Sequence, residues 1–474
     1  MKINIASNEI VHFIGIGGIG MSGLAQIMKN MGFSIQGSDL NENKNTERLI
    51  KSGIKVYFGH NKKNLKKSTM IVVSSAIKKN NKELIAAKSK KLPIFKRGEM
   101  LANVVALKKN IVITGSHGKT TTTSLVANIL VEAGLDPTVI NGGVINSLKN
   151  TAQLGKGEWA VIESDESDGS FLKLPITYSI VTNIDREHLD FYWNFEKLKN
   201  CFREFIEKTP SFGKSVVCND KDSLRKILKN CNTNNFLTYG FRKDSNYQII
   251  NIKKNKTYSK FDLKVSLVGD KIYKIKNIKV NLLGNHNVCN ATASVIIALN
   301  LGIKINKIKN ALKKFLGIQR RFTKVFSIEK KEFFDDYAHH PTEIKAVIES
   351  AREVYKFRKI ICVFQPHRYS RLKALTSEFA SSFKLSNQVI LCPVYAAGEK
   401  VNFKFNQNKF AELITKKSKV QVINIKNKIE LKIFFKKNLT SDELIICMGA
   451  GSISNWIREI GNELKWTGFL KWKS

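Results

Sequence analysis

The sequence predicts an α/β protein with three domains: a Rossmann-like N-terminal domain, a central phosphate-loop-type domain with a mainly parallel sheet, and a Rossmann-like C-terminal domain. Short apolar runs alternate with segments of helical periodicity, glycine-rich turns join them, and polar residues follow the apolar runs. A chain of 474 residues is also too long for one compact core. We expect the domains at residues 1–107, 108–319 and 320–474.

The first glycine-rich turn lies in VHFIGIGGIGMSGLA, between an apolar run and an amphipathic segment. Gly15, Gly17 and Gly20 follow the pattern G-x-G-x-x-G, and Asp39 ends the next apolar run. Such glycines let backbone N–H groups approach a pyrophosphate, and the acidic residue can accept a hydrogen bond from a ribose hydroxyl. The pattern suits NAD and equally a UDP-sugar. A turn that only packs a helix on a strand is the third interpretation.

The second glycine-rich turn, in NIVITGSHGKTTTTSLVANIL, predicts a strand, a phosphate-binding loop and a helix. The common pattern G-x-x-x-x-G-K-[ST] would need glycine in place of Ile113, so this loop is shorter. Lys119 can reach the β- and γ-phosphates, and the Thr120 hydroxyl can bind Mg²⁺. The alternative is a turn that caps an ordinary helix. Four threonines in the first helical turn disfavour that alternative because threonine is a mediocre helix former.

Two further apolar runs end in polar clusters, within WAVIESDESDGSF and VTNIDREHLDFY. The clusters contain Glu163, Asp165, Glu166 and Asp168, and then Asp185, His188 and Asp190. Carboxylates crowded at one strand end repel one another unless a cation lies among them, and Mg²⁺ uses one or two of them. His188 suits a metal site, a position behind the metal ligands, or a role in proton transfer. A solvated turn is the alternative for the acidic cluster.

Polar residues also flank a long apolar helix near the end of the predicted central domain. His286, Asn287 and Asn290 lie just before this helix, where they could contact a base or ribose or simply cap the helix. Arg320 and Arg321 follow at the expected domain junction. An arginine there could stabilise a transferring phosphoryl group, although exposed arginine pairs are also common on solvated surfaces.

The predicted C-terminal domain contributes DDYAHHPTE and FQPHRYSR, again at strand ends. Arg368 and Arg371 could grip a small carboxylate through paired hydrogen bonds. His339 and His340 are a weak indication of a metal because no third ligand is evident.

The composition gives a net charge of +40, which invites a nucleic-acid interpretation. The lysines are mixed with asparagine and isoleucine throughout the chain, a pattern that A/T-rich codons produce without a selected partner. We therefore expect no nucleic-acid partner, although a positive field would attract phosphorylated substrates.

The seven cysteines form no C-x-x-C pair, which favours reduced core residues. No run is long enough to span a bilayer, and glycines interrupt the apolar N-terminus, so we expect a cytoplasmic protein without membrane insertion.

Assembled in order, the motifs resemble those of the Mur ligase family over essentially the whole chain. The motifs are GIGGIGMSGLA, GSHGKTTT, ESDESDGSF, GNHNVCNA, DDYAHHPTE, FQPHRYSR and GAGSI. Phosphate loops of that family have the short form G-[TS]-H-G-K-T. Departures are few: Ser116 stands where threonine is usual, Glu187 where aspartate is commoner, and SRLKAL replaces the usual continuation after SR.

The resemblance implies an ADP-forming ligase of peptidoglycan precursor synthesis that joins L-alanine to the carboxylate of UDP-N-acetylmuramate, using ATP and Mg²⁺. A branch of the family that adds a preformed peptide to the same sugar nucleotide is the nearest alternative, and FQPHRYSR favours alanine. Two other classes, a nicotinamide-dependent oxidoreductase and a basic nucleic-acid ATPase, each explain only one feature of the chain.

The resemblance also assigns expected roles to individual residues. Catalytic roles fall to Lys119, His188 and Arg321. The ATP-binding residues are expected to be Gly115, Ser116, His117, Gly118, Lys119, Thr120, Thr121, His286, Asn287, Asn290, Arg321 and Asp336. Gly17, Gly18, Asp39 and Ser74 are expected near the UDP-sugar; His340, His367, Arg368 and Arg371 near the amino acid; and Thr120, Glu163 and His188 at the metal.

Overall fold

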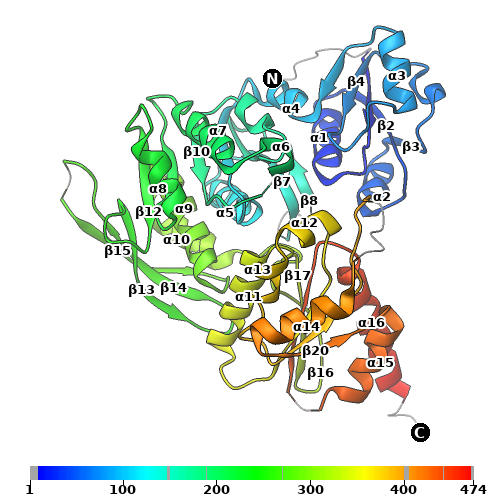
Figure 1. Cartoon of the computed structure of the whole chain (residues 1–474). Helices are drawn as coiled ribbons and strands as arrows, with labels where there is room; N and C mark the ends of the chain where they lie inside the picture. The colour runs from blue at the N-terminus through cyan, green and yellow to red at the C-terminus, as the bar shows by residue number, and fades with distance from the viewer. Residues whose placement is uncertain are drawn as a thin grey trace. The chain divides into compact units, whose positions relative to one another are not determined.

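The computed structural model describes residues 9–146, 150–187, 189–269, 271–399, 405–440 and 442–470. The chain divides into two compact units. The first comprises residues 1–253, 260–281 and 287–316, and the second comprises residues 254–259, 282–286 and 317–474. Three sheets with helices between their strands confirm the predicted α/β class (Figure 1). The expected domain boundaries at 107/108 and 319/320 stay predictions.

The N-terminal sheet is parallel throughout, in the order β3-β2-β1-β4-β5. Its strands are β1 (Ile10–Ile14), β2 (Ser34–Asp39), β3 (Lys55–Phe58), β4 (Met70–Val73) and β5 (Ile94–Lys96). The helical segments are α1 (Ile19–Asn30), α2 (Lys44–Lys51), η1 (Lys62–Leu65), α3 (Lys82–Ser89) and α4 (Arg97–Val105). The strand order reverses between β1 and β4, and the glycine-rich turn after β1 lies at this point, where such sheets bind ligands.

A buried polar network joins β1 and β2 of this sheet to α3 and η1. The Glu83 carboxylate on α3 lies 3.4 Å from His12 Nε2 on β1 and accepts a hydrogen bond of 2.5 Å from Ser38 Oγ on β2. Asn64 Nδ2 donates to its other oxygen at 2.6 Å. Burial alone raises the pKa of a carboxyl group, but the contacts with His12, Ser38 and Asn64 outweigh it and lower the pKa of Glu83 to about 2. The network therefore needs the ionised form of Glu83.

Acid should selectively weaken this part of the fold. Because the folded-state pKa lies below the ordinary 4.5, the Glu83 carboxylate contributes about 3 kcal/mol at neutral pH, and this contribution fades as the pH falls from 4.5 toward 2. Hydrogen exchange of β1 and β2 should show a large loss of opening free energy in Glu83→Gln at pH 7 and a small one near pH 3. The exposed Glu47→Gln is the control. A pH-independent difference would contradict the assignment.

The central sheet has ten strands in the order β15-β14-β13-β12-β11-β10-β6-β9-β7-β8. Seven of them are β6 (Lys109–Thr114), β7 (Thr138–Ile145), β8 (Asn150–Gln153), β9 (Trp159–Glu163), β10 (Tyr178–Val181), β11 (Ser215–Cys218) and β12 (Phe236–Gly240). The helical segments are α5 (Lys119–Glu132), η2 (Ser170–Lys173), α6 (Leu189–Tyr192), α7 (Phe195–Glu207), α8 (Asp222–Lys229), α9 (Asn285–Asn300) and α10 (Ile305–Lys314). Strand β6 lies between β9 and β10 and is parallel to both, so three polar strand ends meet at one edge.

Strands β13 (Tyr247–Lys254), β14 (Ser259–Val265) and β15 (Tyr273–Val280) continue the central sheet beyond β12. The sequence predicts an appended antiparallel piece between Tyr239 and Leu283. Asn255 N donates to Tyr258 O across the short turn between β13 and β14, and neighbouring strands joined by so short a turn run antiparallel. Strand β12, however, pairs with β13 in parallel.

The C-terminal sheet has the order β16-β17-β21-β18-β19-β20, with only the β16–β17 pair antiparallel. Its strands are β16 (Thr323–Ile328), β17 (Lys331–Asp336), β18 (Ile360–Phe364), β19 (Gln388–Leu391), β20 (Gln421–Asn424) and β21 (Leu444–Met448). Its helices are α11 (Pro341–Val354), α12 (Tyr369–Ala374), α13 (Thr376–Ala380), α14 (Gln407–Ser418), α15 (Lys428–Asn438) and α16 (Ile453–Leu470).

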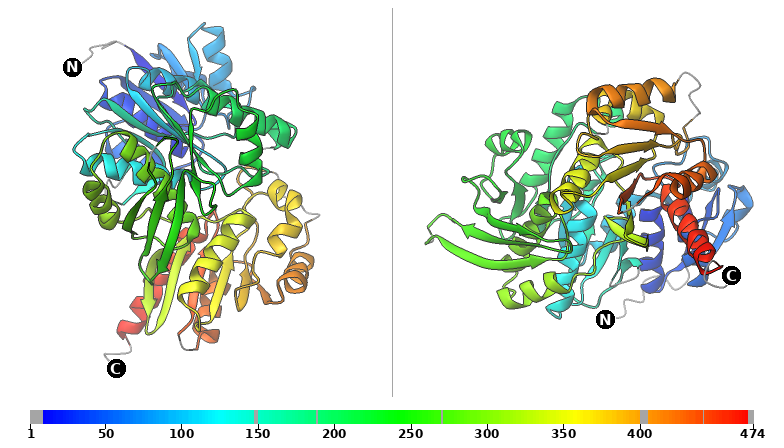
Figure 2. Two further views of the ribbon diagram at one scale, coloured as in Figure 1. Left: turned by 90° about the vertical axis from the view of Figure 1, so that its left-hand side faces the viewer. Right: turned by 90° about the horizontal axis from the view of Figure 1, so that it is seen from below.

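Alternate residues of the C-terminal sheet bury opposite faces. Cys362 and Phe364 of β18 pack with α11, α13 and α14, whereas Ile361 and Val363 pack with α15 and α16 (Figures 1 and 2). Strands covered on both faces read as continuous apolar runs, which is why IICVF shows no alternation in the sequence.

All seven cysteines are free, as predicted, and four of them are buried. Among the described residues, no helix is both long and apolar enough to cross a membrane.

Candidate nucleotide and substrate sites

Strand β6, a glycine-containing turn and α5 follow one another in the predicted order, and we call this turn, which is expected to bind phosphate, the phosphate loop. Gly115 has φ +133°, and a Cβ there would lie 2.2 Å from Thr182 Oγ1. Gly118 has φ +82°, and a Cβ there would lie 2.6 Å from Asn290 Oδ1. Both positions therefore require glycine, for the backbone conformation and for the lack of a side chain.

The end of β10 braces this loop. Asn183 accepts a 2.9 Å hydrogen bond from His117 N through Oδ1 and donates one of 2.9 Å to His117 O through Nδ2. Thr182 Oγ1 donates to the same carbonyl at 2.6 Å. His117 Nε2 lies 2.8 Å from Asp185 Oδ2, and Asp185 N donates to Ser116 Oγ at 2.8 Å. The loop is held in shape by protein groups alone.

Gly115→Ala tests the close approach of this loop to β10. The added methyl group clashes with Thr182 and Asn183, so we expect the Kd for ATP to rise at least about tenfold. Gly134→Ala is a matched control, because Gly134 at the other end of α5 has φ +84° with no atom within 4 Å of an added Cβ. Both variants should lose about 1 kcal/mol of stability from backbone strain. Equal ATP affinity in the two, measured by calorimetry, would contradict a packing role for Gly115.

Glu163, the last residue of β9, and Glu166, three residues later, have different partners. Glu163 accepts a 3.0 Å hydrogen bond from Thr120 Oγ1 and one of 2.5 Å from Gly142 N. Glu166, only 1% exposed, lies 2.7 Å from Lys119 Nζ. Burial by itself lowers the pKa of Lys119, but the carboxylates, led by Glu166, outweigh burial and raise that pKa above its ordinary value. Lys119 is therefore an ammonium ion at physiological pH.

Thr120 and Glu163 fit the expected magnesium site. The Thr120 hydroxyl and the Glu163 carboxylate are hydrogen-bonded to each other, and Mg²⁺ prefers oxygen ligands of these two kinds. The third expected ligand, His188, lies outside the described residues. Thr121, expected at the nucleotide, is buried in the first turn of α5.

Of the expected nucleotide-binding residues at the start of α9, Asn290 lies against the phosphate loop. Asn290 packs against Gly118 and donates to Asn287 Oδ1 at 3.2 Å. His286 belongs to the second unit, where an added Cβ on Gly284 would lie 2.7 Å from its ring. A nucleotide-binding role of these three residues stays a prediction.

The Asp39 carboxylate accepts hydrogen bonds from backbone N–H groups, one of them in the first glycine-rich turn. Gly17 N donates to Asp39 Oδ2 at 2.8 Å, and Leu40 N donates to Asp39 Oδ1 at 2.8 Å. Gly18 caps α1, and a Cβ on Gly15 would lie 3.1 Å from Ser74 Cβ. The expected UDP-sugar residues thus gather around one turn, where Asp39 already orders the glycines.

In the second unit, Asp336 lies at the end of β17. Its carboxylate accepts 2.7 Å hydrogen bonds from Phe322 N and Ala338 N. Burial, partly offset by the charge of Arg321 and by these hydrogen bonds, raises its pKa to about 6. Arg321 lies over the Tyr337 ring at 5.5 Å. Arg320 donates to Gly449 O at 2.6 Å, so this arginine has a structural role rather than a solvated one.

The expected amino-acid residues lie at the starts of two helices, His340 at the start of α11 and His367, Arg368 and Arg371 at or within the start of α12. Burial, helped by nearby positive charges, lowers the pKa of His367 to about 3, so the neutral ring can accept from Arg371, whose Nη1 lies 3.3 Å from its Nδ1. Arg368, at φ +68°, donates its N–H to Tyr395 O at 2.9 Å. His340 caps α11 by accepting from Thr342 N at 3.3 Å.

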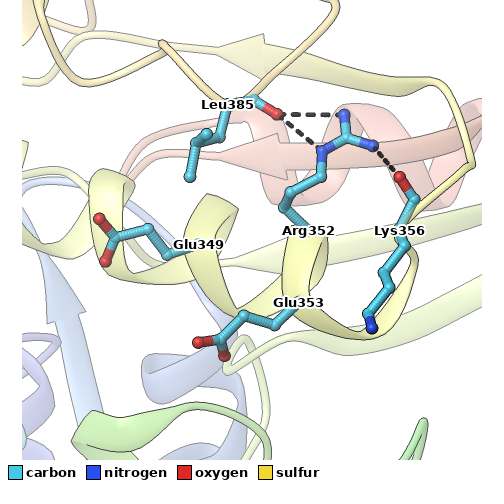
Figure 3. A pocket seen from close by; sticks show the side chains of 5 residues that line it. All are labelled: Glu349, Arg352, Glu353, Lys356 and Leu385. Atoms are coloured by element: carbon cyan, nitrogen blue, oxygen red, sulfur yellow. Dashed lines mark hydrogen bonds between the residues drawn. The ribbon is translucent and has the colours of Figure 1, made fainter.

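One pocket of about 400 Å³ lies elsewhere in the second unit, on α11 (Figure 3). It is lined by Glu349, Arg352, Glu353, Lys356 and Leu385. Arg352 already donates to the carbonyl oxygens of Leu385 and Lys356, so its charge secures the local backbone. None of the residues expected at a site lines this pocket.

Family models match three consecutive segments of the chain. They are described as "Mur ligase family, catalytic domain" (residues 10–109), "Mur ligase middle domain" (113–298) and "Mur ligase, glutamate ligase domain" (320–451). A protein of Pelagibacter ubique named UDP-N-acetylmuramate--L-alanine ligase is 55% identical over 460 residues, which cover 97% of this chain and 99% of that protein. The chain belongs to the Mur ligase family. The resemblance expected from the sequence motifs is thereby confirmed.

Other Mur ligases agree with this membership. A protein of Brucella ovis with the same name is 41% identical over 466 residues, 98% of each chain. The crystal structure of a UDP-N-acetylmuramate-alanine ligase from Thermotoga maritima has a TM-score of 0.81 at 27% identity, and the match covers 96% of this chain and 99% of the other. A murein peptide ligase from Psychrobacter arcticus shares the fold, with a TM-score of 0.71 at 21% identity and coverage of 96% and 99%.

Sequence reasoning missed the Mur ligase residues that shape the phosphate loop from outside it. The sequence motifs do not single out Thr182 and Asn183, and they indicate Glu166 only as one member of an acidic cluster. The sequence does contain an indication of Thr182 and Asn183. They lie in VTN, at the end of an apolar run whose strand is expected to end at the same sheet edge as the phosphate loop.

Proposed function

We propose that this Mur ligase joins L-alanine to the carboxylate of UDP-N-acetylmuramate and converts ATP to ADP and phosphate in the same reaction. The observation that carries the proposal is the 55% identity over nearly the whole of both chains with a relative of that name, combined with the braced phosphate loop. The first amino-acid addition to the peptidoglycan precursor would then be its role, in the cytoplasm.

The proposed reaction has two steps. The muramate carboxylate attacks the γ-phosphorus of ATP, giving an acyl phosphate and ADP; the neutral amine of alanine then attacks the acyl carbon, and phosphate leaves. Lys119 binds the β- and γ-phosphate oxygens through its ammonium group and offsets the charge that develops on them. Thr120, Glu163 and His188 would hold Mg²⁺, which would neutralise further phosphate charge.

The remaining roles belong to substrate binding. Backbone N–H groups of the turn at Gly17 and Gly18, other than the Gly17 N–H, which donates to Asp39, hold the pyrophosphate of the UDP-sugar, with Asp39 and Ser74 beside them. Arg368 and Arg371 grip the carboxylate of alanine, and neutral His367 orients Arg371. Arg321, Asp336 and the polar residues at the start of α9 complete the nucleotide site in this proposal.

Incorporation of labelled L-alanine tests the proposed activity. Purified protein with ATP, Mg²⁺ and UDP-N-acetylmuramate should convert the sugar nucleotide to a product heavier by one alanine residue, as seen by mass spectrometry. A preformed peptide, as used by the peptide-adding branch, is the matched competitor substrate. Conversion with this peptide and none with alanine would contradict the proposal and favour the peptide-adding branch.

A further inference from the structure

The Lys119 ammonium group is fully engaged by protein acceptors. Its Nζ lies 2.5 Å from Gly115 O, 3.3 Å from Ser116 O and 2.7 Å from Glu166 Oε2. A lysine ammonium has three N–H donors, so each can be directed at one of these acceptors. A phosphate oxygen can reach this group only by replacing one of them.

Glu166 is the acceptor that most resembles a phosphate oxygen, because it alone of the three carries a charge. It is 1% exposed, and its backbone carbonyl accepts hydrogen bonds from Gly169 N at 3.2 Å and from the Tyr192 hydroxyl. These bonds fix Glu166 from α6 and from the turn after β9. The two loop carbonyls, by contrast, are part of the phosphate loop and stay beside Lys119 when a ligand binds.

We infer that Glu166 sets the affinity of the nucleotide site: its carboxylate holds the Lys119 ammonium where a phosphate oxygen would, and ATP binding has to break this ion pair. The same pair, on re-forming, favours release of the spent nucleotide. Glu166 thus acts as a positioning residue through Lys119, while Glu163, bonded to Thr120, belongs to the metal. The inference rests on the proposed use of ATP.

The ion pair between Lys119 and Glu166 predicts that removing the Glu166 charge strengthens ATP binding, whereas removing an ordinary binding residue weakens it. Removing the Glu166 charge frees Lys119 for phosphate, so Glu166→Gln should bind ATP more tightly than the natural protein, with a Kd lower by about fivefold or more. The glutamine keeps the shape and one acceptor oxygen. Glu166→Asp, which withdraws the carboxylate by one carbon, should lower the Kd in the same direction but less.

The control separates this contact from the general effect of charge. Asp168→Asn removes one negative charge from the same segment, but Asp168 bonds Ser170 N at 3.0 Å and has no contact with Lys119. Its Kd for ATP should stay within about twofold of the natural value, because Asp168 is partly exposed to solvent, which screens its charge.

The experiment is calorimetric titration of ATP into the natural protein and the three variants, with thermal unfolding to check folding. Tighter binding in Glu166→Gln, or in Glu166→Asp if the former does not fold, together with an unchanged Asp168→Asn, is the expected result. An unchanged or weaker affinity, or the same gain in Asp168→Asn, overturns the inference. Absence of ATP binding in the natural protein would instead overturn the proposed function, so the two failures are distinguishable.

Discussion

Replacing Lys119 by alanine is expected to lower the ATP-dependent ligation rate at least about a thousandfold, while the Kd for UDP-N-acetylmuramate changes by no more than about twofold. The ammonium group lies within the phosphate loop, where it is hydrogen-bonded to Gly115 O, Ser116 O and the Glu166 carboxylate. Its loss removes charge stabilisation that develops only during phosphoryl transfer. The expected UDP-sugar residues, by contrast, lie on the first sheet.

The measurement is kcat with saturating substrates, together with calorimetry of the sugar nucleotide. Lys109→Ala is the matched control, because Lys109 at the start of β6 is exposed and pairs with Glu158 at 2.9 Å. That variant should keep its rate within about twofold. An unchanged rate in Lys119→Ala would remove the phosphate loop from the mechanism.

Replacing Arg371 by alanine should raise the KM for L-alanine about thirtyfold to a hundredfold and leave the KM for ATP nearly unchanged. A charge-assisted pair with a carboxylate accounts for about 2–3 kcal/mol, which corresponds to this range. Neutral His367 orients Arg371 for this contact, because the lowered pKa of His367 lets its ring accept a hydrogen bond from Arg371.

Lys373→Ala, on the same short helix and exposed, controls for loss of a positive charge. Its KM for alanine should change by less than about twofold. If Arg371→Ala changes only the KM for ATP, the assignment of Arg371 to the amino-acid site is wrong, and Arg371 belongs to the nucleotide site.

The fold class was predictable because strand, glycine turn and helix succeed one another in a regular order. Asp39, Thr114 and Glu163 end strands where the sequence places them, since apolar runs stop at polar residues. The parallel pairing of β12 with β13 was not predictable, because strand alternation specifies faces and not neighbours.

The site was predictable as a set of motifs but not as a set of contacts. The phosphate-binding and metal-binding roles expected of Lys119 and Thr120 follow from their position directly after Gly118. Which carboxylate pairs with Lys119, however, depends on the register between β9 and β6. His340 shows the same limit: a pair of histidines before a proline suggested a ligand site, whereas the structure uses the ring to cap α11. Its expected role at the amino acid stays a prediction.

The central claim is that ATP cleavage serves the joining of two specific substrates. The most direct measurement is phosphate release by the purified protein with ATP and Mg²⁺, omitting UDP-N-acetylmuramate and L-alanine in turn. We predict release that requires both substrates together. Release that continues without either one would contradict the claim and would show that the nucleotide site serves a different reaction.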